Sequence, residues 1–298
     1  MTYGMNAKRK AALINYSNLL VLGGFAGLTI FLGLPLAVMQ RVSLRVKGFL
    51  NAFAIGILIF LIVDVFSHAW ESVSDAATGA FAGSAPVGDA ALNLIALFGG
   101  MAVGLLGLTW YGSHYMRGSF VRAPVNGAGL TGTDGKGKQE LQIMQQVETY
   151  RLSMMIAVGI GAHNFSEGLA IGQSYVSGAL GLAFMLIVGF AAHNATEGFG
   201  IAAPLTGLSK KPSVRFLALA GLIGGGPTFV GTVVGSLLAS TFTYILFLSV
   251  AGGALIYVTM LMYNAGRRQV TNDLLMLGFF FGLSAGFITD LLVTLGGA

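Results

Sequence analysis

Apolar residues occur along the chain in eight long runs separated by polar stretches. The runs cover roughly residues 15–39, 48–70, 89–112, 149–173, 179–205, 213–238, 241–264 and 272–295. Each run is long enough to cross about 30 Å of hydrocarbon as an α-helix, which rises about 1.5 Å per residue. The pattern therefore predicts an all-α polytopic membrane protein whose eight transmembrane helices form a single transmembrane domain over residues 1–298.

Lysine and arginine are found in every second connection between these runs. The connections after the first, third, fifth and seventh runs are basic, whereas those after the second, fourth and sixth contain no lysine or arginine. Because basic loops stay in the cytoplasm, we expect both termini to be external and the longest connection, residues 113–148, to be a cytoplasmic loop. The basic residues 8–10 oppose this orientation, but thirteen others outnumber them. We therefore expect a multi-pass protein of the cell membrane.

The composition agrees with a lipid environment. The chain is 55% hydrophobic and only 9% charged, and its 45 glycines are typical of closely packed membrane helices, with Gly231 and Gly235 as one example. It contains no cysteine, which excludes disulfides and thiolate ligands. The net charge of +5 does not imply a nucleic-acid partner, because membrane topology explains where the basic residues lie.

A His-Asn-x-x-Glu-Gly motif occurs twice, thirty residues apart, inside the fourth and fifth runs. The copies read HNFSEG from His163 and HNATEG from His193. Ionisable side chains cost at least a few kcal/mol each in lipid, so histidine and glutamate at matching depths need a compensating partner such as a cation. At about 100° per residue, the imidazole, amide and carboxylate of each copy share one helix face. The candidate metal ligands are His163, Asn164, Glu167, His193, Asn194 and Glu197.

This set of donor atoms suits particular metals. Imidazole nitrogen with carboxylate and amide oxygen suits Zn²⁺, Fe²⁺, Mn²⁺ or Co²⁺ better than Ca²⁺ or Mg²⁺. A cluster that only held helices together would gain about 1 kcal/mol per hydrogen bond, too little to explain two carboxylates at depth. The motif pair therefore predicts a metal site between the fourth and fifth runs.

A second polar stripe lies near the external end of the second run. Asp64 and His68 are four residues apart and share a helix face with Glu71. Asp64 and His68 could form the path by which a metal ion enters. They could also be a polar lining packed against a neighbouring helix, and Asp290 has the same structural interpretation.

The eight runs, the external termini, the long cytoplasmic loop and the paired HNFSEG and HNATEG motifs together resemble the ZIP (Zrt/Irt-like) family of divalent metal transporters, in its prokaryotic form. The resemblance implies a ZIP-like bundle, a homodimer and transport of metal ions into the cytoplasm, with the first, fourth, fifth and sixth spans moving as one unit. It also implies that the six motif residues are the ligands. The substrate would be Zn²⁺, or alternatively Fe²⁺, Mn²⁺, Co²⁺ or Cd²⁺, and no cofactor is expected.

The chain departs from the family pattern at three positions. Many members have proline before the motif glutamate, where this chain has Ser166 and Thr196. Some members have a glutamate before the proline of the sixth span, where this chain has Gly226 before Pro227. The missing carboxylate favours one tight and one weak site over a binuclear centre.

Two other classes of protein use similar residues. A proton or other cation transporter would use Glu167 and Glu197, but would not need an imidazole one turn before each. An intramembrane metallohydrolase would need HExxH, with a second histidine at i+4 and a glutamate free to activate water. Here the residue at i+4 is the glutamate and the residue at i+1 is asparagine, so we do not expect an enzyme.

Overall fold

The computed structural model describes residues 16–39, 43–115, 135–206, 208, 210–238, 240–267 and 270–295. Over these residues the chain is helical and contains no strand, which confirms the all-α fold. The helices are α2 (Tyr16–Leu28), α3 (Leu44–Phe81), α4 (Val87–Tyr115), α5 (Gly135–Val176), α6 (Leu180–Ala202), α7 (Val214–Leu237), α8 (Thr241–Gly266) and α9 (Asn272–Leu295). Short 3₁₀ turns extend α2 as η1 (Thr29–Leu32) and η2 (Leu34–Val38), and α6 as η3 (Ala203–Leu205).

Among the described residues, six helical segments are long and apolar enough to cross a membrane, which confirms a polytopic membrane protein. They are Tyr16–Val38, Leu44–Phe81, Val87–His114, Val214–Leu237, Thr241–Asn264 and Asn272–Leu291. The fourth and fifth predicted spans correspond to α5 and α6, which are not among the six. Both helices carry a copy of the polar motif. The count of eight crossings therefore stays a prediction.

Two helices extend beyond the apolar runs that predicted them. The second run ends at residue 70, but α3 continues to Phe81 through sequence that contains no proline. It stops where Gly83 adopts a φ of 71° and the Ser84 N–H donates to the Gly79 carbonyl, a common way for a helix to end. The last part of the predicted 113–148 loop is likewise helical, because α5 already begins at Gly135. Hydropathy indicates which residues lie in the hydrocarbon layer, and a helix can continue beyond that layer.

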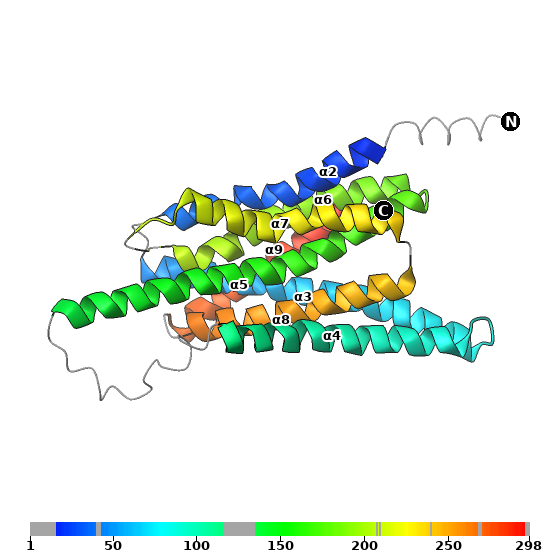
Figure 1. The fold of residues 1–298 in the computed structure, drawn as a ribbon, viewed down its shortest axis with the longest axis horizontal. Coiled ribbons are helices and arrows are strands. Elements are labelled where there is room, and N and C mark those ends of the chain that lie inside the picture. The colour runs from blue at the N-terminus through cyan, green and yellow to red at the C-terminus, as the bar shows by residue number, and fades with distance from the viewer. Residues whose placement is uncertain are drawn as a thin grey trace.

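Successive long helices run in opposite directions, so that α2 begins and α9 ends at the same end of the bundle (Figure 1). The described basic residues lie at the other end, which we call the basic end: they are Arg45, Lys47, Lys136, Lys138, Arg151, Lys210, Lys211, Arg215 and Arg267. Within the described part of the chain, no lysine or arginine lies at the opposite end. We call that the acidic end, because Glu71, Asp75 and Asp89 lie there. Lys8, Arg9 and Lys10 lie outside the described residues.

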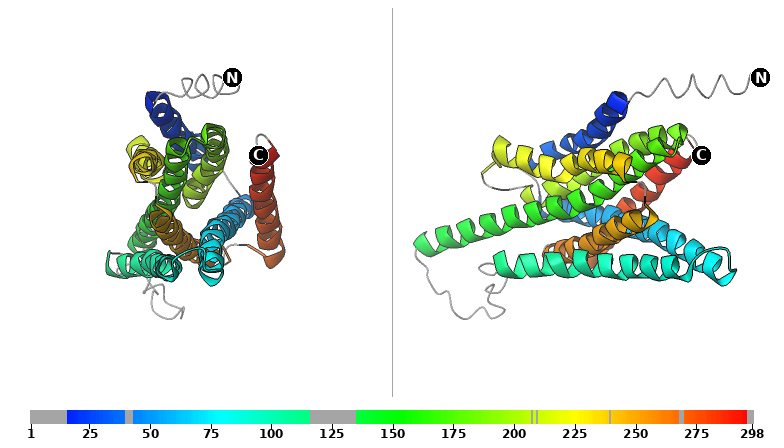
Figure 2. Two further views of the ribbon diagram at one scale, coloured as in Figure 1. Left: turned by 90° about the vertical axis from the view of Figure 1, so that its right-hand side faces the viewer. Right: turned by 45° about the vertical axis from the view of Figure 1, so that its right-hand side comes forward.

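The helices form two groups (Figure 2). The motif group contains α2, α5, α6 and α7, and its most extensive pairing is α5 with α7. The second group contains α3, α4, α8 and α9, which pack mainly as α4 with α8 and α3 with α9. The groups meet chiefly where α5 contacts α8, with smaller contacts of α6 with α9 and with α3. Both copies of the motif therefore belong to one group.

Glycines bring the backbones of α5 and α7 together. A Cβ atom on Gly231 or Gly235 of α7 would collide with the backbone carbonyls of Phe165 or Leu169 on α5. A Cβ atom on Gly168 of α5 would collide with the backbone of α7 in the same way. Only residues without a side chain permit this approach, which stabilises membrane helices through van der Waals contact.

Candidate metal centre

The motif residues face each other inside the bundle. His163, Asn164 and Glu167 come from α5, and Asn194 and Glu197 come from α6; each is at most 4% exposed. Because His163 and Glu167 are four residues apart, the imidazole and the carboxylate lie on one helix face. His193 belongs to α6, but its side chain lies outside the described residues. The structure thus buries five of the six predicted ligands and brings His163, Glu167 and Glu197 close together.

The imidazole of His163 lies between the carboxylates of the two helices. Its Nε2 atom is 3.3 Å from Oε1 of Glu167 and 3.7 Å from Oε1 of Glu197. Ligand atoms bound tetrahedrally at about 2.0–2.1 Å from a zinc ion would be separated by about 3.3 Å. The distance from His163 to Glu167 therefore matches that between two ligands of one zinc ion, and the distance to Glu197 is slightly longer.

The two asparagines are anchored in equivalent ways. The Asn164 Nδ2 atom donates to the Gly224 carbonyl of α7, and the Asn194 Nδ2 atom donates to the Ala26 carbonyl of α2, both at 2.9 Å. Each amide thus uses its donor on a neighbouring helix and keeps its oxygen for another partner.

Many buried polar atoms of the motif make no hydrogen bond. They are both ring nitrogens of His163, both carboxylate oxygens of Glu197, Oε2 of Glu167 and the amide oxygens of Asn164 and Asn194. A buried polar atom without a hydrogen bond costs about 1–3 kcal/mol, so several in one place need an explanation. A divalent cation would satisfy the oxygens and an imidazole nitrogen together.

The side chains of the motif do not surround a common point. Among the described residues, no group of three or more histidine, aspartate and glutamate side chains could hold a metal ion as it stands. His163 points at the carboxylates themselves. Binding an ion therefore requires these side chains to turn towards a common centre.

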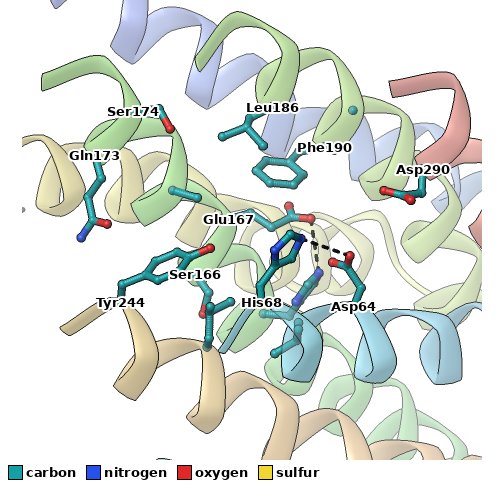
Figure 3. Close-up of a pocket in the computed structure, with 15 residues that line it drawn as sticks. Asp64, His68, Ser166, Glu167, Gln173, Ser174, Leu186, Phe190, Tyr244 and Asp290 are labelled. Atoms are coloured by element: carbon teal, nitrogen blue, oxygen red, sulfur yellow. Dashed lines mark ion pairs between the residues drawn. The ribbon is translucent and has the colours of Figure 1, made fainter. Parts of the chain in front are cut away.

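A cavity of about 340 Å³ connects the motif with the second polar stripe. Its lining includes His163 and Glu167 together with Asp64 and His68 of α3 (Figure 3). His68 Nε2 is 3.5 Å from Oδ1 of Asp64, and His68 Nδ1 is 4.0 Å from Oε2 of Glu71. Two of the residues predicted to bind the ion, His163 and Glu167, therefore share one cavity with the two predicted to admit it.

Five polar residues of the lining were not predicted as part of the site: Ser166, Gln173 and Ser174 of α5, Tyr244 of α8 and Asp290 of α9 (Figure 3). Asp290 gave a usable signal, because an isolated carboxylate in an apolar run is costly without a function. Tyr244 gave none, since single aromatic residues are common in such runs. Ser166 was noticed only as a departure from a family pattern.

The cavity lies on one side of the motif. On each helix, the cavity-lining residues lie level with the motif or between it and the acidic end. Examples are Ser174 of α5, Leu186 of α6 and Asp290 of α9. On the other side, buried apolar residues from both groups pack together and close the path. We call these residues the plug: Ile156, Ala157 and Ile160 of α5, Ile201 of α6, and Leu255 and Val258 of α8.

A membrane bundle with buried histidine and glutamate side chains beside a one-sided cavity has the architecture of an ion transporter. A profile of the family described as ZIP Zinc transporter matches residues 125–288, which is more than half of the chain and includes both motif copies. The protein therefore belongs to the ZIP zinc transporter family, whose members transport divalent metal ions. A search of curated proteins found no match.

Proposed function

We propose that the protein transports divalent transition metal ions, chiefly zinc, into the cytoplasm through a site between α5 and α6. The proposal rests on one observation: buried donor atoms from both motif copies converge beside the cavity without hydrogen bonds to satisfy them. The ligands would be His163, Asn164, Glu167, Asn194 and Glu197, with His193 as the sixth. The metal is cargo and not a resident cofactor.

The charges of the site favour a divalent ion. Glu167 and Glu197 together carry two negative charges when ionised, which would balance M²⁺ in a region from which water is largely excluded. Imidazole adds a ligand of borderline softness, which favours Zn²⁺, and leaves Fe²⁺, Mn²⁺, Co²⁺ and Cd²⁺ as further substrates. Because ligands bind in their deprotonated forms, uptake should weaken in acid.

Inward transport follows from the distribution of charge. The positive-inside rule assigns the basic end to the cytoplasm, so both termini would be external and residues 113–148 cytoplasmic in the cell membrane. The cavity then opens outwards, and Asp64 and Asp290 on its wall attract cations from outside. Release requires the plug to separate.

The separation into two groups suggests how the plug could open. The ligands all belong to the motif group, whereas much of the cavity wall belongs to the second group. Movement of one group against the other would carry the ion past the plug. The second group would form the fixed part of a homodimer.

Uptake by purified protein tests the proposal. Liposomes containing the protein and an internal zinc-sensitive dye should accumulate Zn²⁺, and Glu167→Ala or Glu197→Ala should abolish this uptake. Asp89→Ala is the matched control, because Asp89 is an acidic residue at the start of α4 that does not line the cavity. Proton flux without any metal uptake would instead support a proton transporter.

A further inference from the structure

The strongest further feature is a hydrogen bond between the two helix groups. Ser166 Oγ donates to the backbone carbonyl of Phe247 on α8 at 3.0 Å, and its contact with the Ala162 carbonyl of its own helix is longer, at 3.4 Å. Ser166 is 1% exposed and directly precedes Glu167. The bond therefore links the second group to the chain segment that carries a proposed ligand.

Several other long-range hydrogen bonds between described residues stay within one group. In the motif group, Thr29 donates to Ala191, Ser153 donates to Ile201, and the two motif asparagines bond to α7 and α2. In the second group, Asn51 donates to Met262. The bond from Ser166 is different because the groups cannot move past each other while it persists.

An aromatic contact accompanies this hydrogen bond. The ring centroids of Phe165 and Phe247 are 4.8 Å apart, so two consecutive residues of α5 contact one residue of α8. A hydrogen bond has a short range and a preferred direction, so it defines one register of α5 against α8. Apolar contacts alone would allow sliding more readily.

We propose that Ser166 is a latch that holds the protein in the conformation whose cavity opens to the acidic end. The latch rests on the proposed transport function and specifies how its conformational change is controlled. Where a proline would leave this position without a donor, the serine hydroxyl stabilises one register and must release the Phe247 carbonyl before the plug opens. Ser166 is thus a positioning residue and not a ligand.

The absence of cysteine from the sequence makes a labelling experiment possible. A single Ala157→Cys substitution places a thiol in the plug, where residue 157 is 0% exposed. A water-soluble thiol reagent would reach it only when the plug separates. In reconstituted protein with Zn²⁺ present, the labelling rate therefore reports the population of the opened conformation.

Adding Ser166→Ala should raise this labelling rate about threefold to tenfold, the ratio expected for loss of one hydrogen bond between membrane helices. Ser153→Ala is the matched control: Ser153 is a fully buried serine on the same helix, and its 2.8 Å bond to Ile201 stays within the motif group. It should leave the labelling rate unchanged. If Ser166→Ala is labelled no faster than Ser153→Ala, the latch is overturned. This holds whatever the absolute labelling rate of the two variants is.

The outcome can be separated from that of the transport proposal. If wild-type protein takes up Zn²⁺ and Glu167→Ala does not, an unchanged labelling rate in Ser166→Ala removes the latch alone. If wild-type protein takes up no metal ion, the transport proposal fails regardless of the labelling result.

Discussion

The two sides of α5 are built differently. Towards α7, Gly168 and the glycines of the facing helix bring two backbones into contact, and Asn164 adds a hydrogen bond to Gly224. Towards α8, the contact is made through side chains, among them those of Phe165 and Ser166 and the apolar residues of the plug. Backbones in close contact cannot shift without a clash, whereas side chains can rotate and find new partners. We therefore expect the α5–α7 interface to stay intact during any movement and the α5–α8 interface to be able to slide.

The largest effect on stability and uptake should come from disrupting the α5–α7 interface. Gly231→Ala would push a methyl group into the Phe165 carbonyl of α5 and force the backbones apart. We expect a loss of about 1–3 kcal/mol in stability, as for other overpacked contacts, together with loss of uptake. Thermal unfolding in detergent measures the first effect and liposome assays the second.

Gly226→Ala is the matched control on the same helix. A Cβ atom at Gly226 meets no atom within 4 Å, so this variant should unfold at the wild-type temperature or slightly above it. Equal destabilisation by the two substitutions would show that close backbone contact is not what joins α5 to α7.

Metal-dependent stabilisation should come next in size. A ligand at one hundred times its dissociation constant adds about 2.7 kcal/mol to the stability of the state that binds it. We expect Zn²⁺ to raise the unfolding temperature of the wild-type protein but not that of Glu197→Ala. Stabilisation of equal size in both proteins would mean that zinc binds elsewhere.

The smallest effect should come from the wall of the cavity. Asp64→Asn removes a charge that lines the path without being part of the buried donor cluster. We expect the KM for Zn²⁺ to rise a few-fold while kcat stays nearly constant, and the difference should shrink at high ionic strength. A large fall in kcat would instead make Asp64 a ligand in the transport step.

The sequence predicted those features that depend on local spacing. Apolar runs located the helices, and the interval between His163 and Glu167 fixed a shared face before any tertiary structure was considered. The described part of the chain brings that face against Glu197 of α6. The side chain of His193 lies outside the described residues, so its role stays a prediction.

Features that depend on how helices sit against one another could not be predicted. The anchoring of Asn164 on Gly224 requires the register of α5 against α7, and the bond from Ser166 to Phe247 requires the register of α5 against α8. Hydropathy also placed the end of α3 too early, because the helix continues beyond its apolar part to Phe81. For the two hydrogen bonds, the pattern of residues along one helix contains no information about the helix that it will contact.

The central claim is that α5 and α6 bind one metal ion jointly. Calorimetric titration of the purified protein with Zn²⁺ tests it most directly, using Glu167→Gln and Glu197→Gln, which keep the shape of the side chain but remove its charge. We expect each substitution alone to weaken binding at least tenfold, because each removes a charged ligand of the same ion. Unchanged affinity in either variant would contradict a site shared between the two helices.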